Sequence, residues 1–129
     1  MERILIAEDE PICRQILEAL LKAEYAVTAC ADGDQVIAAL KAEPEAFKCL
    51  VLDMRMPNTD GFGVLDFMRT NGYLERIPVI ALTVFNEKEN QLKCYQAGVC
   101  DLVEKPYNKE ILRIKIRNVI ERANNGTKV

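Results

Sequence analysis

The chain has 129 residues, half of them apolar and 29% charged, with a net charge of −3, which suits one ordinary globular domain. The negative charge and the lack of a basic cluster argue against a nucleic-acid partner, and no apolar run reaches the roughly 20 residues that span a bilayer. The amino terminus is too short and too acidic for a secretory signal, so we expect a cytoplasmic protein that does not contact a membrane.

Five short apolar runs are typical of strands buried on both faces. In chain order these predicted strands cover residues 3–7, 25–30, 49–53, 78–83 and 100–103. Turn signals, caps and apolar residues at three- and four-residue spacing predict a helix after each strand, over residues 11–23, 33–42, 63–70, 86–97 and 108–122. This alternation predicts a single α/β domain whose parallel sheet is covered by helices on both faces. We place the domain at residues 1–123 and expect a flexible tail over residues 124–129.

Polar side chains stand where these predicted strands end. In chain order they are Glu8 and Asp9, Asp53, Thr83 and Lys105. Because the carboxyl ends of parallel strands meet at one edge of a sheet, we expect these groups to converge there. Taken singly, each has an ordinary explanation, such as a helix cap at Asp9 or a solvated loop lysine at Lys105.

Three carboxylates, a hydroxyl and an ammonium suit phosphoryl transfer onto a carboxylate. Asp53 would be the nucleophile and would form an acyl phosphate. Glu8 and Asp9 would join Asp53 in holding a hard divalent cation through oxygen ligands. That cation and Lys105 would neutralise the phosphoryl oxygens, and Thr83 would donate one hydrogen bond. Crowded carboxylates raise one another's pKa values, so the set argues for its own cation.

The residue types that are absent or scarce narrow the chemistry further. The chain has no histidine, which excludes Ser-His-Asp and Cys-His mechanisms and a phosphohistidine on this chain. Any metal must therefore prefer oxygen ligands, as Mg²⁺, Mn²⁺ and Ca²⁺ do. The five cysteines form no close pair, and we expect reduced thiols that pack as small buried apolar groups; they are Cys13, Cys30, Cys49, Cys94 and Cys100.

Together these motifs resemble the response-regulator receiver domain of two-component signalling. The matching segments are Glu8-Asp9, Asp53-Met54-Arg55-Met56-Pro57 with Asp60-Gly61, Thr83 and Lys105-Pro106. They occur in order along nearly the whole chain, from about residue 3 to residue 122. The resemblance implies a flavodoxin-like, doubly wound fold with strand order 2-1-3-4-5. It also implies a cis peptide bond before Pro106.

The resemblance assigns a role to each site residue. Asp53 would be the phosphoacceptor, and Thr83 and Lys105 would contact the phosphoryl group, with Thr83 moving on activation. Mg²⁺ or Mn²⁺ would be bound by Glu8, Asp9, Asp53 and the main-chain carbonyl of Arg55.

Four positions depart from the family's pattern or vary within it: Glu8, Arg55, Val84 and Leu102. Glu8 stands where Asp is more usual, and its extra methylene would shift the metal contact. Val84 stands where Ala or Gly is usual and would crowd the phosphoryl group, while Arg55 would tune dephosphorylation. Leu102 replaces the Tyr or Phe that many members turn inward with the threonine, so any relay must use another element.

The chain ends directly after the last predicted helix, so we expect a stand-alone regulator and no enzyme beyond its own phosphorylation and dephosphorylation. A sensor histidine kinase or a histidine phosphotransfer protein would donate the phosphoryl group. The output would be another protein, bound by the surface of the fourth helix, fifth strand and fifth helix. We expect a monomer or a phosphorylation-dependent dimer.

Three other interpretations stay open from the sequence. The chain could be a docking module that works without phosphorylation, or a receiver fragment of a larger response regulator or hybrid kinase. A phosphohydrolase of the haloacid-dehalogenase type would need its nucleophile at the end of the first strand and a second Asp two residues on. The segment Glu8-Asp9-Glu10 does not supply that pair.

Overall fold

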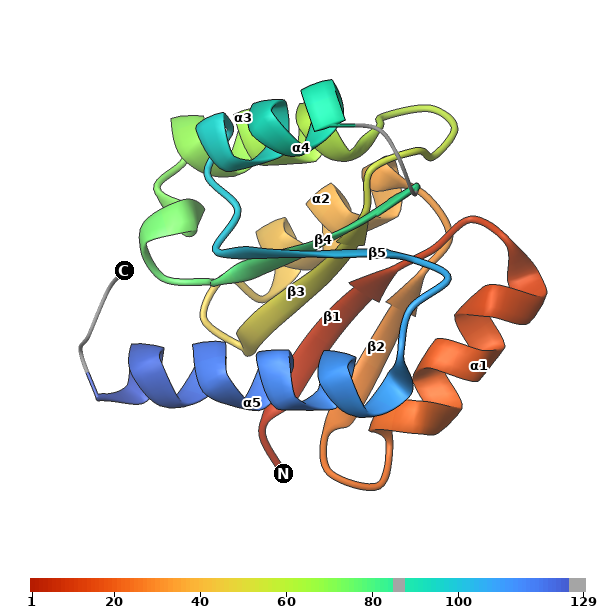
Figure 1. Cartoon of the computed structure of the whole chain (residues 1–129). Helices are drawn as coiled ribbons and strands as arrows, with labels where there is room; N and C mark the ends of the chain where they lie inside the picture. Colours follow the sequence, from red (N-terminus) through yellow and green to blue (C-terminus); the bar gives the residue numbers. More distant parts are fainter. Residues whose placement is uncertain (85–87, 126–129) are drawn as a thin grey trace.

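The structure, a computed structural model, describes residues 1–84 and 88–125 (Figure 1). Within these residues five strands form one sheet: β1 (Arg3–Ala7), β2 (Ala26–Cys30), β3 (Phe47–Asp53), β4 (Val79–Val84) and β5 (Asp101–Lys105). The helices are α1 (Pro11–Leu21), α2 (Gly33–Ala42), α3 (Gly61–Thr70), α4 (Lys88–Gln96) and α5 (Lys109–Asn124), with a short 3-10 helix, η1 (Tyr73–Glu75). Every strand pairing is parallel and the order is β2-β1-β3-β4-β5, which confirms the predicted fold class.

Helices cover both faces of the sheet (Figure 1). Successive residues of a strand point to opposite faces. Along β1, Leu5 and Ala7 pack in the core under α2, α3 and α4, whereas Ile4 and Ile6 pack under α1 and α5. Every residue of β3 except Lys48 is buried. Double coverage therefore explains why the central strands are continuous apolar runs rather than alternating patterns.

Side-chain caps begin most of the helices at the carboxyl edge of the sheet. An Asp or Asn oxygen accepts the main-chain N–H three residues later at the start of α2, α3 and α5; the capping residues are Asp32, Asp60 and Asn108. Glu10 caps α1, with Pro11 at the first helical position. The strands thus deliver their last side chains to an edge that also carries the helix amino termini.

Several predicted boundaries need correction. The third strand is predicted to begin at residue 49, but β3 already begins at Phe47, because this side chain is buried and pairs in register with Arg3. Strand β5 extends to Lys105, which pairs with Val84, so the lysine lies in the strand rather than after it. The predicted start of the fourth helix at residue 86 lies outside the described residues.

The carboxyl terminus and the peptide bond before Pro106 can also be compared with prediction. Asn124, the first residue of the predicted tail, is helical, and its Nδ2 donates to Glu2 Oε2 at 3.1 Å. Residues 126–129 of that tail lie outside the described residues. The peptide bond between Lys105 and Pro106 is cis, as the resemblance implied.

None of the helices among the described residues combines the length and the apolar character that a membrane crossing requires.

The prediction of buried thiols was right for three cysteines and wrong for two. Cys30, Cys49 and Cys94 are buried, whereas Cys13 and Cys100 are exposed. Cys13 lies on the outer side of the first turn of α1, and Cys100 lies in the connection before β5. Composition alone does not show on which side of a helix or at which end of a strand a cysteine falls.

Two glycines contact the β3–α3 loop at Thr59 and allow a stability prediction. A Cβ at Gly33 would lie 2.0 Å from the carbonyl oxygen of Thr59, whereas one at Gly63 would lie 2.6 Å from its methyl group. Because the main chain shifts less easily than a side chain, we expect Gly33→Ala to lower the free energy of unfolding by about 3 kcal/mol and Gly63→Ala by at most about 1 kcal/mol. Urea unfolding of both variants measures this, and equal losses would contradict it.

Candidate functional site

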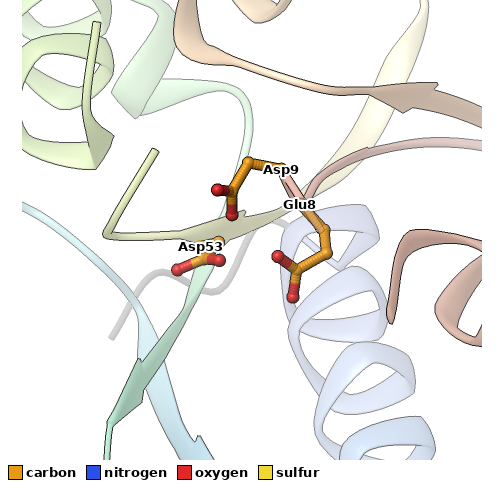
Figure 2. Close-up of side chains that lie close together, drawn as sticks. All are labelled: Glu8, Asp9 and Asp53. Atoms are coloured by element: carbon orange, nitrogen blue, oxygen red, sulfur yellow. The ribbon is translucent and has the colours of Figure 1, made fainter. Parts of the chain in front are cut away.

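Side chains from three strand ends and the β1–α1 connection meet at the carboxyl edge of the sheet. Lys105, at the end of β5, donates from Nζ to Glu8 Oε1 at 2.6 Å and to Asp53 Oδ2 at 3.0 Å. Glu8, Asp9 and Asp53 point into one small space (Figure 2), and each places a carboxylate oxygen within 4.8 Å of the others. The fold therefore brings together the carboxylates and the ammonium that the strand ends predicted.

These carboxylates differ in burial. Glu8 and Asp53 are only 3% and 5% exposed, whereas Asp9 is exposed. Burial, together with the nearby Asp53 carboxylate, raises the pKa of Glu8 to about 7, against the opposing effect of Lys105. Burial lowers the pKa of Lys105, but its hydrogen bonds to Glu8 and Asp53 outweigh that and raise the pKa overall. Lys105 thus stays charged at neutral pH, whereas burial and the nearby Asp53 disfavour the charged form of Glu8.

Thr83 carries a polar atom that lacks a partner. Its Oγ1 is buried and makes no hydrogen bond to any described residue. Leaving a buried hydroxyl unpaired is costly, so such atoms call for an explanation. Thr83 and Asp53 both line a pocket of about 210 Å³ at this edge of the sheet. A ligand bound beside Asp53 would supply the missing partner.

The loop after β3 brings Arg55 to the site through its main chain. The Arg55 N–H donates to Asp53 Oδ1 at 3.0 Å, so both oxygens of the Asp53 carboxylate accept hydrogen bonds. Arg55 also lines an open hollow next to Asp9. Val84 also lines the pocket that contains Asp53 and is 41% exposed, while Leu102 is buried in the core under α4.

The sequence reasoning missed residues that position the site. Arg14 Nη1 donates to the main-chain oxygens of Glu8 at 2.9 Å and Asp9 at 3.2 Å, and so holds the turn that carries both carboxylates. The signal available in the sequence was the position of Arg14 in the first turn of α1, shortly after the Glu8-Asp9 segment.

The β3–α3 loop is held in a similar way by side chains at the start of α2. Asn58 Nδ2 donates to Asp32 Oδ2 at 2.8 Å, and Thr59 Oγ1 donates to Asp34 Oδ1 at 2.5 Å. Asn58 adopts a φ of +65°, which Asn tolerates better than most residues. The segment Asn58-Thr59-Asp60-Gly61 is typical of a turn, but the sequence does not indicate that this loop contacts α2.

A family model for the response regulator receiver domain matches residues 4–117. The chain belongs to the response-regulator receiver family. This receiver domain is 32% identical over 127 residues to the probable transcriptional regulator ycf27 of Porphyridium aerugineum, a match that covers 98% of the chain and 51% of the relative. It is 33% identical over 123 residues to the two-component response regulator ORR24 of Oryza sativa subsp. indica, covering 95% and 19%. The receiver thus spans about half, or much less, of these curated relatives.

Solved structures show the same fold. The receiver domain of sensor histidine kinase PA1611 from Pseudomonas aeruginosa PAO1, crystallised with a magnesium ion in its active site cleft, is 31% identical with a TM-score of 0.82, covering 93% of this chain and 98% of that one. Chemotaxis protein CheY4 of Vibrio cholerae is 26% identical with a TM-score of 0.83, covering 92% and 98%. Both the family and the fold class predicted from the sequence are confirmed.

Proposed function

We propose that this receiver domain accepts a phosphoryl group on Asp53 from a partner's phosphohistidine and thereby changes its binding to another protein. The observation that carries the proposal is the unpartnered Thr83 hydroxyl in the pocket that Asp53 also lines, while Lys105 donates to the Asp53 carboxylate. These two donors have the chemistry that a phosphoryl group on Asp53 requires. Thr83 lacks a hydrogen bond that such a group would provide.

The acidic residues fit a hard divalent cation. Three carboxylate oxygens lie within 4.8 Å of one another, and the raised pKa of Glu8 reflects buried negative charge that a cation would relieve. We propose that Mg²⁺ or Mn²⁺ is held by Glu8, Asp9, Asp53 and the main-chain carbonyl of Arg55. The magnesium ion in the related PA1611 receiver supports this assignment. When bound, the cation supplies positive charge that neutralises the carboxylates and the phosphoryl oxygens.

Asp53 acts as the nucleophile in this proposal. One of its oxygens forms a bond to phosphorus while the bond from phosphorus to the donor's imidazole nitrogen breaks, and the nitrogen leaves with that electron pair. The Arg55 N–H and Lys105 orient the carboxylate before the donor arrives. Lys105 and Thr83 then donate to the phosphoryl oxygens. We propose no catalysis beyond this self-phosphorylation and the later hydrolysis, with Val84 and Arg55 at the pocket controlling access.

The partners follow from the family. We propose a sensor histidine kinase or a histidine phosphotransfer protein as donor, and a cytoplasmic protein target that binds the surface of α4, β5 and α5. Helices α4 and α5 expose apolar side chains that suit protein contact: Leu92, Tyr95, Ile111 and Ile114. We propose a stand-alone regulator, monomeric or dimerising on phosphorylation. A receiver joined to further domains, as the greater length of the relatives favours, is the alternative.

Intact-mass spectrometry after incubation with acetyl phosphate or phosphoramidate tests the proposal. We expect the wild type to gain one phosphoryl group in the presence of Mg²⁺ and none in excess EDTA. Asp53→Asn should gain none, whereas Asp66→Asn, which changes an exposed Asp on α3, should behave like the wild type. A gain by Asp53→Asn would place the acceptor elsewhere. If neither small donors nor a panel of phosphorylated kinases adds a phosphoryl group to the wild type, the result would favour a docking module that works without phosphorylation.

A further inference from the structure

Helix α4 is anchored to the sheet by few side chains. Among the residues described for this helix, Cys94 is the buried one, and most of the others are polar. Gln91 Nε2 donates to Glu104 Oε1 at 2.6 Å, in a partly buried hydrogen bond that joins α4 to β5. At the other end of α4, the Gln96 main-chain oxygen accepts from Arg69 Nη2 at 3.2 Å, which ties α4 to α3. The Gln91–Glu104 bond therefore ties the first half of α4 to β5.

This hydrogen bond lies next to the phosphoacceptor pocket. Glu104 pairs in register with Thr83, so both side chains lie on the sheet face that α4 covers, and Glu104 directly precedes Lys105. On the helix side, Asn90, which precedes Gln91, lines the same pocket as Asp53 and Thr83. Gln91 thus directly follows a residue that lines the pocket, and Glu104 pairs in register with another residue that lines it.

We propose that the Gln91–Glu104 hydrogen bond holds α4 in its unphosphorylated position and that phosphorylation of Asp53 releases it. This inference rests on the proposed function. A phosphoryl group on Asp53 draws the Thr83 hydroxyl and the Lys105 ammonium toward itself, and both residues adjoin Glu104. A shift of β5 that carries the Glu104 carboxylate beyond hydrogen-bond distance of Gln91 Nε2 would release Gln91. Leu102 has no hydrogen-bonding group in its side chain, so it cannot take the place of this hydrogen bond.

Amide hydrogen exchange of the α4 peptides, measured by mass spectrometry on the full chain, tests the proposal. Without ligand, we expect α4 to exchange roughly threefold to tenfold faster in Gln91→Ala than in the wild type. The matched control is Gln96→Ala, the same substitution at an exposed position of the same helix, which should exchange like the wild type. Glu104→Ala should resemble Gln91→Ala, whereas Glu104→Gln keeps an acceptor oxygen and should restore most of the protection.

The second half of the test adds beryllofluoride with Mg²⁺ as an unreactive phosphoryl mimic. We expect the wild type and Gln96→Ala to exchange faster in α4 on its addition, and Gln91→Ala to change little because its bond is already absent. Equal exchange of Gln91→Ala and Gln96→Ala without ligand would overturn the proposal. If acetyl phosphate modifies the wild type while its α4 exchange stays unchanged, the release is wrong and the proposed function stands. If no donor modifies the wild type, the proposed function fails and the release step fails with it.

Discussion

Replacing Lys105 by Met should slow the phosphorylation of Asp53 by about a hundredfold to a thousandfold, the loss that typically follows removal of one donor to developing negative charge. Lys105 Nζ already lies 3.0 Å from Asp53 Oδ2, so its charge is in place before the phosphoryl group arrives. Met has a similar length and no charge, so the variant would leave Glu8 and Asp53 buried without the positive charge of the Lys105 ammonium. Intact-mass time courses with acetyl phosphate and saturating Mg²⁺ give the rate.

The design of this experiment separates charge from packing. Lys109→Met, which changes an exposed lysine four residues further along the chain, should keep the wild-type rate. Lys105→Arg keeps the charge but carries a larger, planar group, so we expect a rate between those of the wild type and Lys105→Met. A Lys105→Met rate within about threefold of the wild type would remove Lys105 from the phosphoryl site.

The second large effect concerns pH and arises from Glu8. Its pKa of about 7 lies above the ordinary value near 4.5, so between these pH values the folded apoprotein binds more protons than the unfolded chain. By linkage, stability from this group is fully present below about pH 4.5 and is lost as the pH rises through about 7. The loss is on the order of 3 kcal/mol. A divalent cation binds the deprotonated form, so its stabilising effect should grow over the same interval.

Thermal unfolding of the wild type and Glu8→Gln from pH 5 to pH 8, with and without Mg²⁺, measures both effects. The wild-type apoprotein should lose stability relative to Glu8→Gln as the pH rises, because Gln takes up no charge. Added Mg²⁺ should recover the loss in the wild type at pH 8 and have little effect on Glu8→Gln. The exposed-site variant Glu121→Gln should follow the wild type throughout. Parallel curves for the wild type and Glu8→Gln would show that Glu8 does not titrate in this range.

Much of the site could be predicted because its logic is local and topological. A run such as Cys49–Leu52 that stops at Asp53 marks a buried strand and its end, and parallel pairing then puts every strand end at one edge. Glu8 and Lys105 are 97 positions apart, yet this rule alone brings them to the same edge. What the rule does not supply is which partner each polar group finds there.

Hydrophobic periodicity and strand-end chemistry are properties of neighbouring residues. The strands and helices, the parallel sheet and the set of groups at its carboxyl edge could therefore be predicted from the sequence. Three features of the site become visible in the folded domain alone. Lys105 bridges Glu8 and Asp53, the Thr83 hydroxyl has no partner among the described residues, and Gln91 reaches Glu104. These outcomes depend on helix rotation and strand register between elements distant in the chain. A hydrogen bond forms or fails over a few tenths of an ångström, and no local pattern specifies distances of that size.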